Sequence, residues 1–166
     1  MHPVPQAQGT NRVSALSGHI DWDRPIKFLW LQGLVDRSVQ RELQHIVVRH
    51  GLSLPEYSTL SVLHATPELS NAELARRSLV TPQSMNEVIA RLEQRHLVER
   101  RNHPDHGRIL LTSVTEAGRG VIVGAAADVA AFEDELVDGI PADDVAQTKQ
   151  VLTTVLSRLL ERANAD

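Results

Sequence analysis

Two closely spaced helix starts, followed by two β-type runs, constrain the fold of this chain more than any other feature. Ser70 and Glu73 have the spacing of a capping box, in which each side chain accepts a hydrogen bond from the other residue's backbone amide. Thr81 followed by Pro82 marks a second start, because threonine accepts a hydrogen bond at the N-cap and proline needs no amide partner there. Two short helices are therefore predicted, the first ending near Ser78.

The second of these helices has one apolar face and one polar face. Its apolar residues recur at spacings of three and four and predict a buried stripe: Met85, Val88, Ile89 and Leu92. The polar residues fall outside that stripe: Gln83, Ser84, Asn86, Glu87 and Arg91. A short helix followed by a second one with a polar outer face is typical of a helix-turn-helix that enters a DNA groove.

The two β-type runs are residues 97–101 and 109–114, and the segment between them is rich in turn residues. Together they predict a β-hairpin beside the second helix. Five arginines but only three acidic residues lie between Arg91 and Arg108. Arginine on a protruding hairpin can bind phosphates and enter a narrow minor groove. The whole stretch thus predicts a winged helix-turn-helix with local basic charge.

These motifs resemble, in order and spacing, those of the MarR family of bacterial transcriptional regulators. The resemblance is carried by residues 69–75, 91–100 and 114–118, and it covers about residues 27–160. It implies a mainly α fold with a small β-hairpin wing and with N- and C-terminal dimerisation helices. It also implies a regulator, most often a repressor, whose DNA affinity changes when a small molecule binds between the dimerisation helices and the reading head.

The sequence departs from the family pattern at two positions. The family's wing usually carries an aspartate two residues before the arginine that is Arg108 here, but this chain has His106 there, with Asp105 as its neighbour. In the second helix, Glu87 occupies a position that is often basic in the family. The first departure bears on how the wing is held and the second on which bases are contacted. We interpret Glu87 as the ion-pair partner of a nearby arginine.

The remaining chain is expected to supply the dimer interface. Residues 1–20 read as a flexible arm, 21–52 as an N-terminal dimerisation helix, 53–114 as the winged region and 115–166 as C-terminal dimerisation helices, all in one interlocked domain. In the last helix, apolar residues recur at intervals of seven from Val145 and leave more apolar surface than one chain easily buries. A homodimer is predicted; the alternative is that these helices pack within a single chain.

Charge and composition allow a DNA-binding role. The net charge is −4, but residues 128–144 contain seven acids and no lysine or arginine, so the acidic charge is segregated from the basic stretch. The chain has no cysteine, which excludes disulfides and thiolate metal sites. No stretch is long and apolar enough to cross a membrane and the N-terminus lacks a signal-peptide pattern, so we expect a cytoplasmic protein.

The predicted partner is double-stranded DNA, bound by a two-fold dimer at a pseudo-palindromic site. Gln83 and Asn86 are the leading base readers, because a carboxamide can pair bidentately with adenine. The other candidate DNA contacts are four arginines and one serine: Ser84, Arg91, Arg100, Arg101 and Arg108. No cofactor is expected, and an enzyme is disfavoured because the histidines near the wing tip lack a nucleophile and a pocket.

A small-molecule effector is expected, although the sequence does not identify it. The candidate pocket residues are aromatic or carry imidazole: Trp30, His45, Tyr57 and His64. Two other functions remain open. A metal-responsive regulator could use the eight histidines, although no spacing marks a site. A winged-helix protein-interaction module would bind duplex DNA weakly and with a shallow salt dependence.

Overall fold

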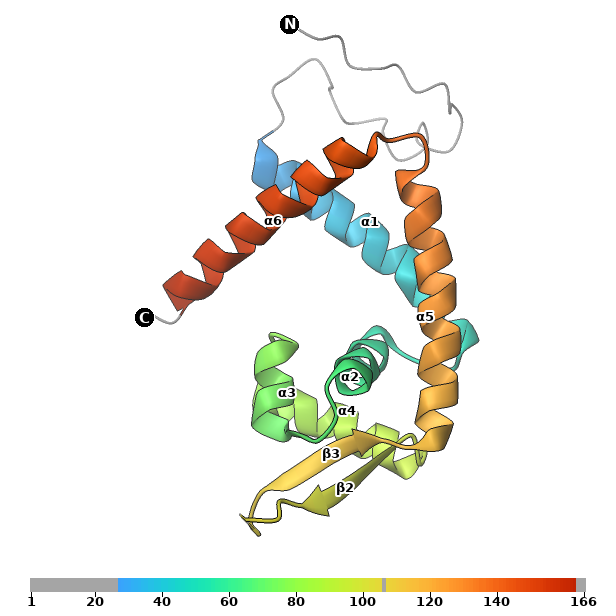
Figure 1. The fold of residues 1–166 in the computed structure, drawn as a ribbon, viewed down its shortest axis with the longest axis vertical. Helices are drawn as coiled ribbons and strands as arrows, with labels where there is room; N and C mark the ends of the chain where they lie inside the picture. Colours follow the sequence, from blue (N-terminus) through green and yellow to red (C-terminus); the bar gives the residue numbers. More distant parts are fainter. Residues whose placement is uncertain (1–26, 106, 164–166) are drawn as a thin grey trace, which may run out of the picture. The chain divides into compact units, whose positions relative to one another are not determined.

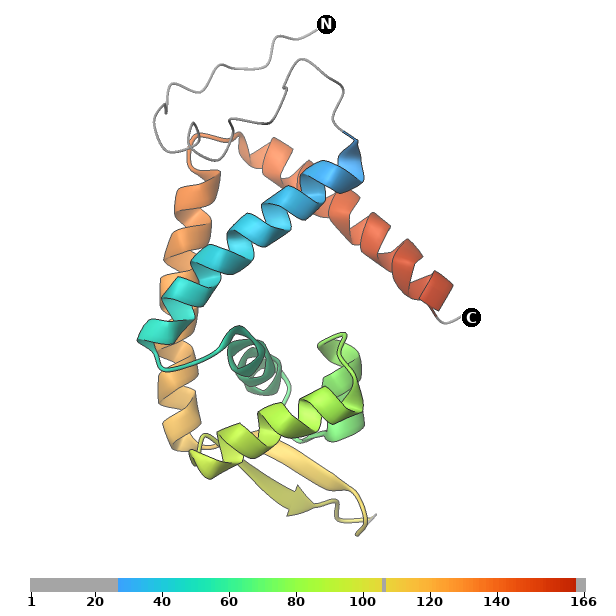
Figure 2. The ribbon, with the colours of Figure 1, turned by 180° about the vertical axis from the view of Figure 1, so that it is seen from behind.

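The structure, a computed structural model, describes residues 27–105 and 107–163 (Figures 1 and 2). The predicted N-terminal arm and His106 lie outside the described residues. In chain order the elements are α1 (Phe28–Arg49), α2 (Leu54–Ala65), β1 (Leu69–Ser70), α3 (Asn71–Arg77), α4 (Pro82–Gln94), β2 (Val98–Asn102), β3 (Leu110–Val114), α5 (Glu116–Val137) and α6 (Ala142–Ala163). The predicted class, mainly α with a small β wing, is confirmed.

The chain divides into two units within α1, between Val39 and Gln40. In the first unit the described residues form the N-terminal part of α1. Several of its large apolar side chains are exposed: Phe28, Leu29, Trp30, Leu31 and Val35. The second unit contains the rest of α1 and every other helix and strand.

The starts of α3 and α4 follow the predicted capping chemistry, and those of α2 and α5 use the same chemistry. Ser53 and Glu56 at α2, and Ser70 and Glu73 at α3, form reciprocal capping boxes. At α4 the Thr81 hydroxyl accepts a hydrogen bond from the Ser84 amide at 3.2 Å, with Pro82 in the first turn. Thr115 caps α5 in the same way, accepting from the Gly118 amide at 3.0 Å. Each start is therefore fixed by residues within a few positions of it.

The turns after α3 and α4 each contain a left-handed residue that is not glycine. Leu79 after α3 has φ 55° and His96 after α4 has φ 56°. After α4, the Leu97 amide donates to the Leu92 carbonyl at 2.9 Å, which closes the turn. This turn brings Leu97, a buried residue, back into the core.

The wing contains one strand more than predicted. β2 and β3 form the expected antiparallel hairpin, with Val98 opposite Val114 and Asn102 opposite Leu110. β1 adds to the other edge of β3, where Leu69 pairs with Thr112, so the strand order is β1-β3-β2. The prediction of a two-stranded hairpin was therefore incomplete, because β1 consists of two residues and is defined by its pairing with a distant strand.

Helix α2 lies at the centre of the second unit and packs against α3, α4, α5 and β3 (Figure 1). The core around it is aliphatic, and its fully buried large side chains include Leu60, Leu63, Leu74, Met85, Ile89, Leu92 and Ile122. The predicted buried stripe of α4 is part of this core, which confirms the interpretation of its spacing. The core thereby fixes which face of α4 is left exposed.

Helix α6 has no buried residue in the described structure. Its exposed apolar side chains are Val151, Leu152, Leu156, Leu159 and Leu160. An ion pair between Lys149 and Glu133, 3.3 Å apart, joins it to α5. Among the residues described, no helix is both long and apolar enough to cross a bilayer.

Candidate nucleic-acid interface

The outer face of α4 is polar and exposed, as its spacing predicts. Gln83, Ser84, Asn86 and Glu87 are all exposed. The hydroxyl of Ser84 lies 2.9 Å from the Thr81 hydroxyl, so this side chain also belongs to the N-cap of the helix. Among the described residues, no arginine forms an ion pair with Glu87, so its predicted ion-pair role is wrong for this structure.

The three predicted wing arginines lie in different surroundings. Arg101 pairs with Glu99 on the same strand, with 2.6 Å between Nη2 and Oε1. The Arg100 side chain is only 26% exposed and reaches toward α4, where Nη1 lies 3.9 Å from an oxygen of Glu93. Arg108 is exposed, and within the described chain it makes no ion pair or side-chain hydrogen bond. Arg108 is thus the wing cation most available to a phosphate.

Arg91 has a partner that no sequence pattern predicts. Its Nε atom lies 3.7 Å from Oε1 of Glu56 at the start of α2. The same oxygen lies 3.5 Å from Nη1 of Arg95, the C-cap residue of α4, four positions after Arg91. The capping box predicts that Glu56 serves α2, but nothing local predicts that it also contacts α4.

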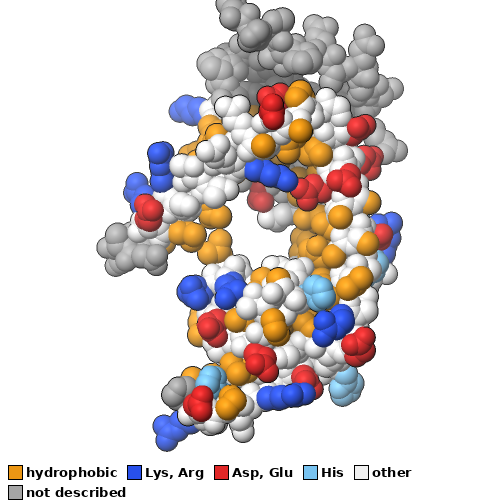
Figure 3. Space-filling model, viewed as in Figure 1, with side chains coloured by type: hydrophobic (Ala, Val, Ile, Leu, Met, Phe, Trp, Pro, Cys, Tyr) orange, Lys and Arg blue, Asp and Glu red, His pale blue; other side chains and the backbone are white. Residues whose placement is uncertain are grey.

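The second unit has an acidic patch that lies away from α4 and the wing (Figure 3). Acidic side chains gather over the C-terminal end of α5 and the turn into α6 (Figure 3), where the sequence places Glu133, Asp134, Glu135, Asp138, Asp143 and Asp144. The arginines described above lie instead on α4 and the wing. A polyanion would therefore approach the α4 side of the second unit more favourably.

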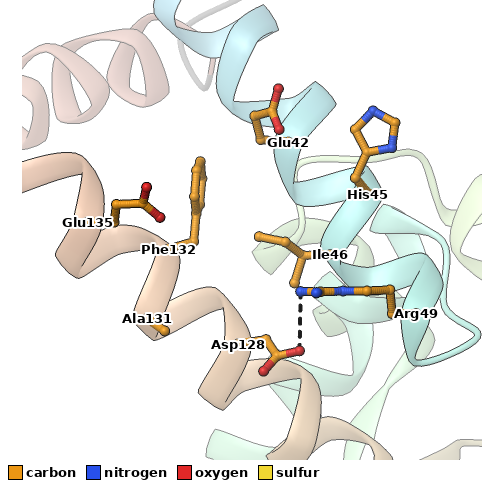
Figure 4. A pocket seen from close by; sticks show the side chains of 8 residues that line it. All are labelled: Glu42, His45, Ile46, Arg49, Asp128, Ala131, Phe132 and Glu135. Atoms are coloured by element: carbon orange, nitrogen blue, oxygen red, sulfur yellow. Dashed lines mark hydrogen bonds and ion pairs between the residues drawn. The ribbon is translucent and has the colours of Figure 1, made fainter. Parts of the chain in front are cut away.

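A groove of about 420 Å³ lies between the C-terminal half of α1 and α5 (Figure 4). Ile46, Ala131 and Phe132 give it an apolar surface. Glu42 and Glu135 place carboxylates toward one end, while Arg49 and Asp128 form an ion pair at the other. Such a lining suits a small molecule that has an apolar ring and a polar group.

Asp128 is the most connected polar group of this groove. One of its oxygens lies 2.9 Å from Nε2 of His50 and accepts a hydrogen bond from Nη2 of Arg49 at 3.3 Å. The hydrogen bond with His50, followed by the positive charge of Arg49, lowers the pKa of Asp128 below its ordinary value. These contacts join the end of α1 to α5.

The four predicted pocket residues do not share one site. His45 lines the α1–α5 groove. His64 lines a separate hollow of about 340 Å³ beside the sheet. Tyr57 is partly buried against the core, and Trp30 belongs to the first unit.

Three groove residues were not predicted from the sequence: Arg49, Asp128 and Phe132. The one available signal was Phe132, an aromatic residue in a protein with 3% aromatics. Among the described residues no group of three or more histidines and carboxylates is placed to hold a metal ion.

Comparison with known proteins identifies relatives of this chain. Residues 50–109 match the sequence model of the MarR family. The HTH-type transcriptional repressor Rv2887 of Mycobacterium tuberculosis is 34% identical over 130 residues, covering 78% of this chain and 92% of the relative.

Two solved structures support the same relationship. The structure of Rv2887 in complex with salicylic acid has a TM-score of 0.63 and 32% identity, and covers 80% of this chain and 98% of that one. CouR from Rhodococcus jostii RHA1, bound to p-coumaroyl-CoA, has a TM-score of 0.70 and 28% identity, with 76% and 89% covered. The similarity therefore extends beyond the reading head to most of the chain.

Proposed function

Because this chain belongs to the MarR family of winged helix-turn-helix transcriptional regulators, which are not enzymes, we propose that it is a ligand-responsive repressor. It binds a pseudo-palindromic operator as a homodimer, and a small molecule releases it. The observation that carries the DNA-binding surface is the exposed polar face of α4, whose opposite face is locked into the core, together with the available Arg108 on the wing.

The base readers in this proposal are Gln83 and Asn86, whose exposed carboxamides can pair with adenine in the major groove. Ser84 and Arg91 contact the backbone beside them. On the wing, Arg108 is the principal phosphate or minor-groove contact, and Arg101 adds a second exposed cation. Arg100 is less exposed and contributes chiefly by attaching the wing to α4.

The homodimer rests on apolar surface that the described chain leaves uncovered. The first unit and α6 both expose large apolar side chains, and α6 buries none of its residues. We assign dimerisation to residues 21–52 and 115–166 and DNA binding to residues 53–114. A two-fold axis would present two α4 helices to successive major grooves, about 34–36 Å apart.

The effector site in this proposal is the α1–α5 groove. Two relatives have been solved with salicylic acid and with p-coumaroyl-CoA, molecules that share a phenolic ring. In this chain Ile46 and Phe132 would contact such a ring, and Arg49 would exchange Asp128 for a ligand carboxylate. A ligand can favour a dimer in which the spacing of the two α4 helices differs from that of successive major grooves. Such a ligand must weaken DNA binding, because the binding of ligand and the binding of DNA are then thermodynamically coupled.

The test is selection of random duplexes by the purified full chain, followed by sequencing and by binding titrations at several salt concentrations. We expect an enriched inverted repeat. Arg108→Ala should weaken binding to all duplexes and reduce the slope of log K against log salt by about 0.9, which corresponds to one phosphate. Asn86→Ala should instead relax sequence preference more than it lowers non-specific binding.

The control is Arg41→Ala, which removes an exposed arginine of α1 that is paired with Glu42 and lies outside the winged region. It should leave the salt slope unchanged. Salicylate added to the same titration should weaken operator binding. No enriched sequence together with a shallow salt slope would reject the DNA-binding proposal in favour of a protein-interaction module, and unchanged affinity with salicylate would reject that ligand.

A further inference from the structure

We propose that Arg95 is a further DNA-phosphate ligand, held next to Arg91 by the buried carboxylate of Glu56, which acts as a positioning residue. This inference rests on the proposed DNA-binding function and extends it to the residue at the C-cap of α4 and to one at the start of α2. The three side chains join elements that are distant in sequence.

Glu56 is an unusual residue for a DNA-facing surface because it is acidic and only 6% exposed. Its Oε2 atom accepts hydrogen bonds from the backbone amide and the hydroxyl of Ser53, at 2.8 and 2.9 Å. A carboxylate held by two such bonds has little freedom to move. Its other oxygen, Oε1, therefore presents a fixed negative charge to α4.

Each arginine forms an ion pair with this carboxylate through only one of its guanidinium nitrogens. Arg91 uses Nε at 3.7 Å and Arg95 uses Nη1 at 3.5 Å. No other ion pair or side-chain hydrogen bond engages either guanidinium within the described chain. The side chains remain 50% and 40% exposed. Each guanidinium thus has one nitrogen in an ion pair with Glu56, while its other nitrogens have no ion pair or side-chain hydrogen bond within the described chain.

The position of the pair on α4 suits phosphate rather than base contact. Arg91 and Arg95 are four residues apart and so share one flank of the helix. The buried stripe lies on one side of them, and the exposed face with Gln83 lies on the other. When a helix enters the major groove, its flanks face the groove walls, which are lined with phosphates.

Glu56 favours phosphate binding by ordering the side chains of Arg91 and Arg95 before DNA binds. A free arginine loses side-chain entropy when it is fixed in one geometry. When a buried carboxylate already orients the arginines, part of this entropy is lost during folding and so is not lost on DNA binding. In the opposite role, Glu56 would mask the two arginines from DNA. Removing its charge with Glu56→Gln would then make Arg95 more important for DNA binding, not less.

The first experiment compares the full chain with Arg95→Ala and with the control Arg41→Ala on the selected operator. We expect Arg95→Ala to reduce the salt slope by about 0.9, so that the loss of affinity between 50 and 200 mM salt becomes about threefold smaller. Binding should weaken on operator and random duplexes alike. A wild-type slope in Arg95→Ala, with a normal slope change in Arg108→Ala, would overturn this inference and leave the proposed function intact.

The second experiment tests Glu56 with Glu56→Gln, because glutamine can still serve in a capping box and so preserves the start of α2. Thermal melting verifies that the variant folds. If Glu56 orients the arginines, Arg95→Ala should lower operator affinity by a smaller factor in the Glu56→Gln background than in the wild type. An equal or larger factor would show that Glu56 is neutral toward Arg95 or masks it, and would overturn its positioning role.

Discussion

Gly118 in the first turn of α5 illustrates how one residue can limit the fold. A Cβ atom built on it would lie 2.0 Å from the carbonyl oxygen of Leu97 and 2.9 Å from a side-chain carbon of Val114. The first of these neighbours is backbone, which cannot move aside as a flexible side chain can. The glycine therefore lets the start of α5 approach the segment that follows α4.

We predict that Gly118→Ala lowers the free energy of unfolding by about 1–3 kcal/mol, the range for overpacking a core. For a domain of this size that corresponds to a fall in Tm of about 2–12 °C. The matched control is Gly120→Ala in the same helix, where no atom lies within 4 Å of the added Cβ. The control should instead gain up to about 1 kcal/mol of stability. Equal melting temperatures for the two variants would contradict the close approach.

Individual residues also show how far the sequence could predict the site. Ser70, Glu73 and Thr81 were assignable because each cap depends on residues within three positions. The arginine partners of Glu56 could not be assigned from the sequence, because Arg91 and Arg95 reach it only after α2 and α4 have packed together. Local chemistry thus predicts where helices begin, whereas the charge environment of the candidate interface depends on packing.

At the scale of elements, the start of α3 depends on the carboxylate of Glu73, whose charged form is stabilised by the hydrogen bonds of the N-cap. Glu73 accepts hydrogen bonds from the Ser70 hydroxyl and amide, at 2.7 and 2.9 Å. These bonds, helped by Arg77 and Arg76, lower its pKa below the ordinary value of 4.5. Because the pKa is depressed in the folded state, the stabilisation is present above pH 4.5 and is lost as the pH falls through the folded pKa.

We therefore predict that wild type melts above Glu73→Gln by a constant margin at about pH 5.5–7.5, and that this margin shrinks as the pH falls below about 4.5. Melting curves followed by circular dichroism would measure it. Ser70→Ala removes the main hydrogen-bond donor and should reduce the pH-dependent part over the same range. A margin that stays unchanged down to about pH 3 would contradict the role of Glu73 in this cap.

The elements that the sequence failed to predict are those defined by distant partners. The strand β1 is only Leu69 and Ser70, and it exists because Leu111 and Thr112 of β3 lie alongside. The α1–α5 groove likewise joins residues 42–49 to residues 128–135, which the sequence separates widely. Neither has a periodic pattern that could reveal it, in contrast to the strong apolar stripe of α4.

At the scale of the whole molecule, the proposed homodimer requires the apolar face of α6. We predict that Leu152→Asp, which places a charge among Leu156, Leu159 and Leu160, gives monomers at concentrations at which the wild type is dimeric. Sedimentation velocity measures this. Gln147→Asp, an exposed position on a different face of α6, should remain dimeric. A Leu152→Asp protein that sediments as a normal dimer would refute this interface.

The carboxylate of Glu56 has a consequence for the evolution of the family. Since one side chain caps α2 and also holds two arginines of α4, residues 53, 56, 91 and 95 cannot vary independently. A lineage that lost the acid would gain little by keeping Arg95 in this position, and one that lost both arginines would leave the buried carboxylate with its hydrogen bonds from Ser53 but without a positive partner. Among relatives, these four positions should therefore co-vary, although Ser53 and Arg95 are 42 positions apart in the sequence.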